Sequence, residues 1–163
     1  MNSVIPIFPL APGDREWVRS VWEKEWEANF VVVHNQVYTP DQVSGFKAVQ
    51  NDIPAGLITY TIVGSKCEIV TINSFQTGTG IGSSLMHAVE KEARVSGCTS
   101  CWLVTTNNNE KAIRFYQKLG YLLVEIHKNA VEEARKLKPS IPFVDEKGTP
   151  ITDELFLEKR LTE

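Results

Sequence analysis

The chain of 163 residues lacks a disulfide framework, a surplus of basic residues and a long apolar run. Its three cysteines are too few, and odd in number, for the disulfide scaffold of a small secreted domain. Lysine and arginine number 17 against 20 aspartates and glutamates, which gives a formal net charge of −3. A nucleic-acid-binding surface normally needs a basic surplus. We therefore expect free thiols in a reducing compartment and no nucleic-acid partner.

Membrane insertion and secretion have no support in the sequence either. No apolar run approaches the ~18 residues that a membrane-spanning helix needs. The first ten residues contain no basic residue and are interrupted by Pro6 and Pro9, unlike a signal peptide. Hydrophobic residues make up 42% and charged residues 23% of the chain, as in ordinary globular proteins. We expect one cytoplasmic domain covering residues 1–163, with no membrane partner.

The pattern of apolar residues predicts a helix, then a series of strands, then alternating strands and helices. After the helix-start sequence Pro12-Gly13-Asp14, apolar residues repeat at helical spacing from Val18 to Trp26, which predicts a helix to about Ala28. Strand-like runs at 30–33, 46–50, 56–63 and 67–72, joined by short turns, favour an antiparallel meander. Further helices are expected at 83–94, 108–119 and 131–137, and further strands at 101–105, 121–126 and 155–158. This order predicts an α/β fold with a single mixed sheet and at least one parallel crossover.

A glycine-rich turn, Gln76-Thr77-Gly78-Thr79-Gly80-Ile81-Gly82, lies between a predicted strand and a predicted helix. Glycines there let a ligand approach the backbone amides, and the helix N-terminus attracts an anion, so a phosphate or pyrophosphate is the expected guest. A dinucleotide-binding fingerprint would need a third glycine where Ser83 stands. A P-loop would need a lysine, yet none occurs between Lys66 and Lys91. Taken alone, the turn is also compatible with a simple strand-to-helix connection.

A second motif follows the turn after about 27 residues: Asn109-x-x-Ala112-x-x-Phe115-Tyr116-x-x-x-Gly120-Tyr121. Together with Gly78-x-Gly80-x-Gly82, it resembles the paired motifs of the GNAT family of acyl-CoA-dependent N-acetyltransferases, over residues 56–126. The resemblance implies an acyl-CoA N-acyltransferase fold, in which a largely antiparallel mixed sheet with flanking helices contains one parallel, splayed pair of strands. It also implies that acetyl-CoA is the cosubstrate and that its acetyl group passes directly to a primary amine.

The resemblance assigns roles to the residues at matching positions. Backbone amides of the turn would bind the pyrophosphate of coenzyme A, and the preceding strand would bind its pantetheine arm. The residues concerned are Thr77, Gly78, Thr79, Gly80, Ile81 and Gly82 in the turn and Val70, Thr71 and Ile72 in the strand. The family motif usually has Gln or Arg where Thr77 stands, whereas Gln76 lies one residue early, which leaves a backbone role for this position.

Asn109 and Tyr116 would complete the coenzyme site. They are seven residues apart, so they share one helical face with ~10 Å between them along the axis. By resemblance, Asn109 would hydrogen-bond the coenzyme, and the Tyr116 hydroxyl would protonate the departing thiolate. Without the glycine turn, a helix cap would explain Asn109 and core packing would explain Tyr116.

The acceptor amine must lose a proton before it attacks, so a base is expected on the acceptor side. Glu68 is the first candidate, because some family members, including histone acetyltransferases, carry a glutamate base at this strand position. The alternative for Glu68 is a solvent-facing charge on the sheet. Glu125 and His127 are weaker candidates for the same role.

The spacing of Cys98 and Cys101 invites a redox or zinc interpretation. The pair follows a predicted helix instead of starting one, which disfavours a redox motif. Cys67 with His87 or His127 has no recognisable zinc-ligand spacing. We therefore expect inert thiols and no metal site.

Several questions stay open at this level. Residues 127–151 are longer than a minimal connection between strands, and they form either a lid over the acceptor site or a solvated surface helix. The rival functions are a non-catalytic acyl-CoA-binding sensor module and a redox protein that uses Cys98 and Cys101. The acceptor, a small-molecule or peptide amine, is not identified by the sequence. Many family members are homodimers, but nothing in the sequence decides the oligomeric state.

Overall fold

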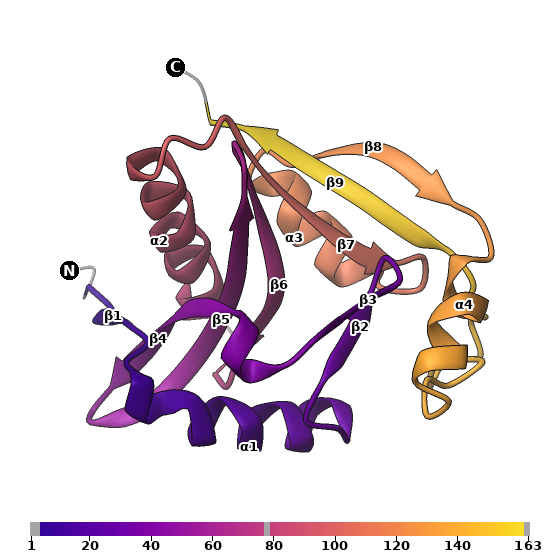
Figure 1. The fold of residues 1–163 in the computed structure, drawn as a ribbon, viewed down its shortest axis with the longest axis horizontal. Coiled ribbons are helices and arrows are strands. Elements are labelled where there is room, and N and C mark those ends of the chain that lie inside the picture. The colour runs from indigo at the N-terminus through magenta and orange to yellow at the C-terminus, as the bar shows by residue number, and fades with distance from the viewer. Residues whose placement is uncertain (1–3, 77–78, 162–163) are drawn as a thin grey trace.

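The computed structural model describes residues 4–76 and 79–161, so Thr77 and Gly78 of the expected phosphate site lie outside the described residues. The strands are β1 (Ile7–Pro9), β2 (Val31–Val33), β3 (Gln36–Tyr38), β4 (Ser44–Gln50), β5 (Ile53–Val63), β6 (Lys66–Ser74), β7 (Ser100–Thr106), β8 (Leu122–His127) and β9 (Glu154–Arg160). The helices are α1 (Arg15–Trp26), α2 (Ile81–Val95), α3 (Glu110–Lys118) and α4 (Ala130–Leu137). Figure 1 shows the seven-stranded sheet, in the order β1-β4-β5-β6-β7-β9-β8, and the separate pair of β2 and β3.

The predicted antiparallel meander consists of β4, β5 and β6. The β4–β5 connection is a two-residue turn in which Asn51 and Asp52 both have positive φ, 54° and 62°. This turn geometry matches the twist of paired strands. Through α2, β6 then crosses over to β7, which lies parallel beside it. The predicted α/β fold, with a mixed and largely antiparallel sheet, is confirmed.

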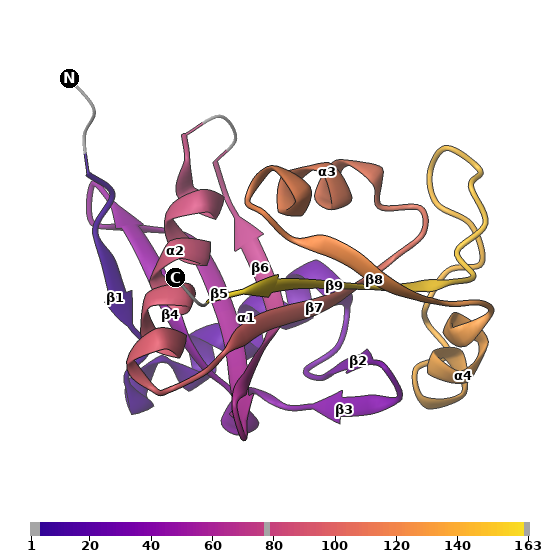
Figure 2. The same ribbon diagram turned by 90° about the horizontal axis from the view of Figure 1, so that it is seen from above.

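The prediction for residues 30–33 is wrong in one respect, because this run is not a strand of the main sheet. Val31–Val33 instead pairs with β3 through the turn His34-Asn35, where φ is 41° and 63°. We refer to residues 31–38 as the hairpin. The sequence did not reveal its second strand, because three residues carry too little pattern to distinguish a strand from a loop. Figure 2 shows the hairpin and α3 on opposite sides of the sheet.

The last strand, β9, enters the sheet between β7 and β8 and is antiparallel to both. Its predicted alternation is confirmed, since Leu155 and Leu157 are buried on one face. β8 therefore forms an edge of the sheet, and its partner is the last strand instead of the one that precedes it in the chain.

The helices pack on two faces of the sheet and form two apolar clusters. The larger cluster joins α2 and α3 to the sheet. The smaller one lies under α1 and contains the fully buried Trp22 together with Val31 of the hairpin. Of the apolar residues predicted at helical spacing in the first helix, Trp22 is therefore part of the core, while Trp26 reaches the cleft described below.

Residues in the left-handed conformation mark several helix boundaries. Glu27, at φ 57°, ends α1, and Gly120, at φ 99°, follows α3. α2 begins at Ile81, two residues before the predicted start, with Gly80 at φ 78° as its N-cap. In the described ranges, no helix combines the length and apolar character required to cross a membrane.

Candidate active site

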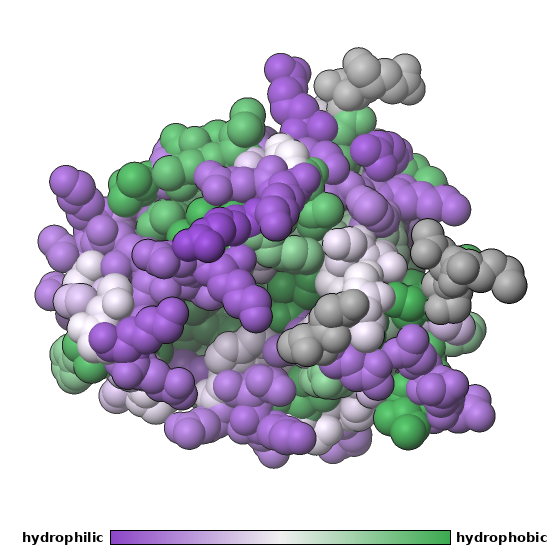
Figure 3. Space-filling view, turned by 180° about the vertical axis from the view of Figure 1, so that it is seen from behind, coloured by the Kyte–Doolittle hydropathy of each residue, from purple (hydrophilic) through white to green (hydrophobic). Residues whose placement is uncertain are grey.

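A cleft opens where β6 and β7 separate. The two strands pair in parallel up to Ile69 and Leu103, and the pairing between their described residues ends there. On its other side β6 has a bulge that leaves Val70 without a partner in β5, and such a bulge bends and twists a strand locally. The cleft has a volume of about 300 Å³ and is walled by the end of α1, by β2, by the separated parts of β6 and β7 and by α3. On the α3 face, Figure 3 shows apolar side chains recessed among polar ones.

The separated part of β6 presents main-chain groups to the cleft. Val70, Thr71 and Ile72 all line it. The hydroxyl of Thr71 is hydrogen-bonded in the interior to Thr59 at 2.6 Å, so its side chain is already engaged. Beyond Ile69, no described strand pairs with β6 on the β7 side. The free edge can therefore pair with an extended ligand in the way that one strand pairs with another.

The described part of the glycine turn leads directly into α2. Gly80 adopts a left-handed conformation that costs other residues energy, and no acidic residue occupies the first helical turn. A side chain on Gly82 would bring its Cβ to 3.1 Å from the ring of Phe115 in α3. The first amides of the helix have no acceptor within the helix itself. The turn thus combines free donors, a helix N-terminus and close packing of α2 against α3.

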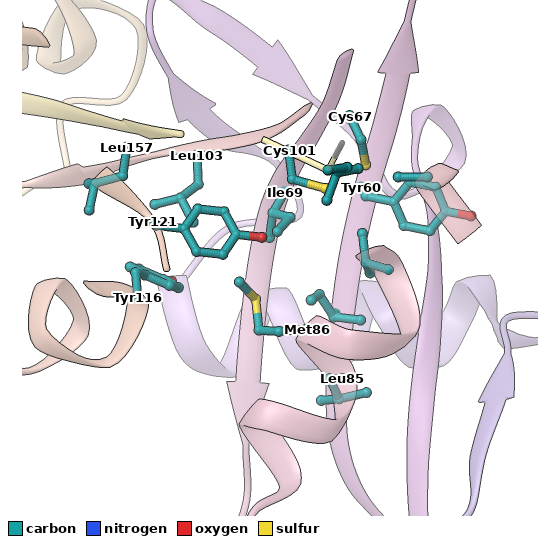
Figure 4. Close-up of a cluster of buried hydrophobic side chains, with 14 of the residues drawn as sticks. Tyr60, Cys67, Ile69, Leu85, Met86, Cys101, Leu103, Tyr116, Tyr121 and Leu157 are labelled. Carbon is teal, nitrogen blue, oxygen red and sulfur yellow. The ribbon is translucent and has the colours of Figure 1, made fainter. Parts of the chain in front are cut away.

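Asn109 and Tyr116 line the same cleft, as their spacing predicts. Asn109 is the N-cap residue of α3, but its side chain does not cap the helix and donates instead to Oγ1 of Thr105 at 3.2 Å. Figure 4 shows Tyr116 beside Tyr121, close to Leu103. Burial raises the pKa of Tyr116 to about 12. The phenol therefore stays protonated at neutral pH and can act as a proton donor.

Glu68 is buried, not exposed on the sheet surface, and it directly precedes Ile69, which lines the cleft, without lining the cleft itself. Its Oε1 accepts a hydrogen bond of 2.5 Å from the hydroxyl of Tyr38. Its Oε2 lies 2.7 Å from Nε2 of His34, whose ring also lies against Trp102. Both donors belong to the hairpin, which covers the carboxylate. His34 and Tyr38 were not predicted, because their relation to Glu68 depends on how the hairpin folds back.

The cleft is also lined by Trp26, β2, Lys138, Ile141 and Glu154. We call this part the acceptor side, because it includes residues of the first helix and of the segment 127–151, the candidate lid over the acceptor site. Glu154 is 6% exposed, and its Oε2 accepts the main-chain N–H of His34 at 3.2 Å. Lys138 is 8% exposed and lies 5.6 Å from the centre of the Phe30 ring. Burial lowers the pKa of Lys138.

The comparisons with known proteins fit this geometry. A sequence model described as the acetyltransferase (GNAT) family matches residues 11–121. The chain belongs to the GNAT acetyltransferase family. It is 42% identical over 160 residues to the uncharacterised protein YdhI of Bacillus subtilis (strain 168), with 98% of each chain covered.

Solved structures of GNAT proteins have a similar fold. One is a GNAT family acetyltransferase from Elizabethkingia anophelis with acetyl-CoA bound, with a TM-score of 0.70 and 20% identity over 96% of this chain and 97% of that one. Another is the ribosomal-protein-S18-alanine N-acetyltransferase from Escherichia coli, with a TM-score of 0.70 and 16% identity over 98% and 96%. At these identities the likeness concerns the fold, and it agrees with the acyl-CoA N-acyltransferase fold expected from the paired motifs.

The weaker candidates for the base, and the cysteines considered for a redox or zinc site, lie outside the cleft of this GNAT domain. Glu125 and His127 bind each other at 2.6 Å on the exposed edge strand, and neither lines the cleft. Cys67, Cys98 and Cys101 are free and buried. Burial raises the pKa of the Cys98 thiol, which disfavours its reactive thiolate form.

Proposed function

We propose that this GNAT protein is an N-acetyltransferase that transfers the acetyl group of acetyl-CoA directly to a primary amine. The observation that carries the proposal is the cleft between β6 and β7, which is lined both by a free strand edge and by Tyr116. The Elizabethkingia neighbour has acetyl-CoA bound, and the Escherichia coli neighbour is named for N-acetylation of an alanine. The free, buried cysteines favour a reducing, cytoplasmic location.

The cosubstrate would lie along β6, with its pyrophosphate at the start of α2. Main-chain groups of Val70, Thr71 and Ile72 would pair with the pantetheine arm. Amides of residues 77–82 would face the pyrophosphate, since α2 begins there with no acidic residue in its first turn. The amide of Asn109, on the opposite wall of the cleft, would complete the binding site.

The transfer forms one bond and breaks one. The neutral amine nitrogen attacks the thioester carbonyl carbon, the C–N bond forms and the C–S bond breaks. Tyr116 donates its phenolic proton to the departing thiolate, and the proton that the nitrogen loses as the amide forms restores the phenol. The pKa of Tyr116, about 12, keeps the phenol protonated before the transfer. Among the described residues that line the cleft there is no cysteine, which favours direct transfer over a covalent acyl-enzyme.

We propose that Glu68 accepts the proton that the amine loses before it attacks. Because neither Glu68 nor His34 lines the cleft, the proton would reach Glu68 through water and His34. When Nε2 of His34 donates to Glu68, Nδ1 is left as a proton acceptor. Glu68→Gln should lower kcat and change its pH dependence, with acetyl-CoA affinity unchanged. Tyr38→Phe is the matched control, because it removes one hydrogen bond to the same carboxylate and leaves the His34 contact in place. An unchanged pH profile in Glu68→Gln would exclude Glu68 from proton transfer.

A non-catalytic acyl-CoA sensor is the rival function, and thiol release distinguishes the two. Free thiol should appear when the protein is mixed with acetyl-CoA and a panel of amines, and Tyr116→Phe should reduce the rate about 100-fold. Calorimetry should find similar acetyl-CoA affinity in both proteins, because the phenol acts on the thiolate that forms later. Tight binding with no thiol release for any amine would establish the sensor function instead.

A further inference from the structure

Two buried charges of opposite sign line the acceptor side of the cleft. They are the carboxylate of Glu154, at the start of β9, and the ammonium group of Lys138, directly after α4. Within residues 4–76 and 79–161, neither charged group lies within 4.0 Å of an opposite charge. The two groups are therefore not paired with each other.

Each charge is only partly compensated by the protein. Glu154 accepts one main-chain N–H, that of His34 at 3.2 Å. Lys138 faces the ring of Phe30 at 5.6 Å and is attracted by the exposed Glu27. Burying a charge is unfavourable unless it is paired or hydrogen-bonded. A ligand that brings a cation to Glu154 and an anion to Lys138 would satisfy both groups at once.

Both groups are held by regular structure. Glu154 is paired with Thr106 of β7 in the sheet. The main-chain N–H of Lys138 donates to the carbonyl of Ala134 at 2.8 Å at the end of α4. The guanidinium of Arg135 fixes the loop that follows through hydrogen bonds to the carbonyls of Ile141, Pro142 and Ile151. The main-chain positions of the two charged residues are thus set before any acceptor binds.

We infer that the acceptor is a zwitterionic amine, an amino acid or a close analogue with a free carboxylate. Glu154 binds its ammonium group, and Lys138 binds its carboxylate. This inference rests on the proposed acetyl transfer and adds the class of acceptor to it. A polyamine would place a second cation against Lys138. A protein N-terminus or an internal lysine offers a peptide group where the carboxylate is required.

The test compares the twenty amino acids with their carboxamides as acceptors, by thiol release at saturating acetyl-CoA. For the preferred side chain, kcat/KM should be at least about tenfold higher for the free acid than for the carboxamide, as expected for a charge-assisted hydrogen bond. Lys138→Met should remove that difference by lowering kcat/KM for the free acid alone. Glu154→Gln should raise KM for both forms, because both carry the ammonium group.

Lys136→Met is the matched control, since this lysine lies on α4, is exposed and binds Glu133 on the surface. It should leave both acceptors unaffected, and acetyl-CoA affinity should be the same in all variants. Turnover of polyamines or carboxamides but of no free amino acid would overturn the inference and leave the proposed acetyl transfer standing. The same holds if Lys138→Met slows both acceptor forms equally. Acetyl-CoA binding with no turnover of any amine would overturn both.

Discussion

Tyr38 on β3 donates a hydrogen bond of 2.5 Å to the buried carboxylate of Glu68 on β6. The contact ties the short hairpin to the main sheet, to which it has no strand pairing in the described chain. Because Val31–Val33 of the hairpin line the cleft, the position of one cleft wall depends on a buried polar contact as well as on apolar packing.

Removing this hydrogen bond should weaken the fold by a measurable amount. Tyr38→Phe should lower the free energy of unfolding by about 1 to 2 kcal/mol, because Glu68 loses one of two donors in the interior. Burial and the hydrogen bond to Glu68 raise the pKa of Tyr38. The contribution of Tyr38 to the free energy of unfolding is therefore fully present below about pH 10, the pKa of tyrosine in the unfolded chain. It is lost as the pH rises through the pKa of Tyr38 in the folded protein.

Urea unfolding at several pH values up to about pH 9 checks this prediction. The control is Tyr60→Phe, a buried tyrosine that stacks on Phe46 and makes no side-chain hydrogen bond to another described residue. It should change stability by less than about 0.5 kcal/mol. Equal losses in the two variants would contradict a specific role of the Tyr38 contact.

Site residues that carry a local sequence motif could be predicted from the sequence. Those that reach the cleft only because of the strand order could not. The glycine turn and the spacing of Asn109 and Tyr116 can be identified from a few neighbouring positions. Glu154 reaches the cleft only because β9 inserts between β7 and β8, and no pattern near residue 154 reports that insertion. Lys138 follows a short polar helix whose position against β2 is likewise a property of the whole fold.

Asn107 shows how a local interpretation can miss a long-range role. In the sequence, residues 107–109 resemble a helix cap. In the structure, the side chain of Asn107 accepts hydrogen bonds from the main-chain N–H groups of Thr152 and Asp153 and donates to the carbonyl of Pro150. The β7–α3 turn thereby holds the segment that leads into Glu154.

Asn107→Ala should therefore disturb acceptor binding more than coenzyme binding. We expect a loss of about 1 to 3 kcal/mol in unfolding free energy, since partly buried main-chain donors lose their acceptor. The acceptor KM should rise severalfold, while the affinity for acetyl-CoA stays the same. Asn108→Ala is the control, because among the described residues the side chain of Asn108 forms hydrogen bonds only with other side chains, those of Thr106 and Asp145. An unchanged acceptor KM in Asn107→Ala would show that the segment before Glu154 does not need this anchor.

Gly80 offers a test of the proposed pyrophosphate site, with Gly64 as its matched control. Both have positive φ, 78° and 61°, and a Cβ added to either would meet nothing within 4 Å. Alanine at either position should cost about 1 to 2 kcal/mol of stability for the left-handed backbone. Only Gly80→Ala should also weaken acetyl-CoA binding in calorimetry, because it alters the entry to α2. Equal acetyl-CoA affinity in the two variants would argue against an anion site at this turn.

The pH dependence of turnover tests the role of Tyr116. Burial raises the pKa of its phenol to about 12, so the acid form persists across the range in which the enzyme can be assayed. At saturating substrates, kcat should therefore show no alkaline decline below about pH 10 that belongs to Tyr116. Tyr116→Phe should lower kcat at every pH without changing the shape of the profile. An alkaline decline in the unmodified protein that disappears in Tyr116→Phe would mean that the phenol ionises far below its expected pKa, and the proposed protonation of the thiolate would then need another donor.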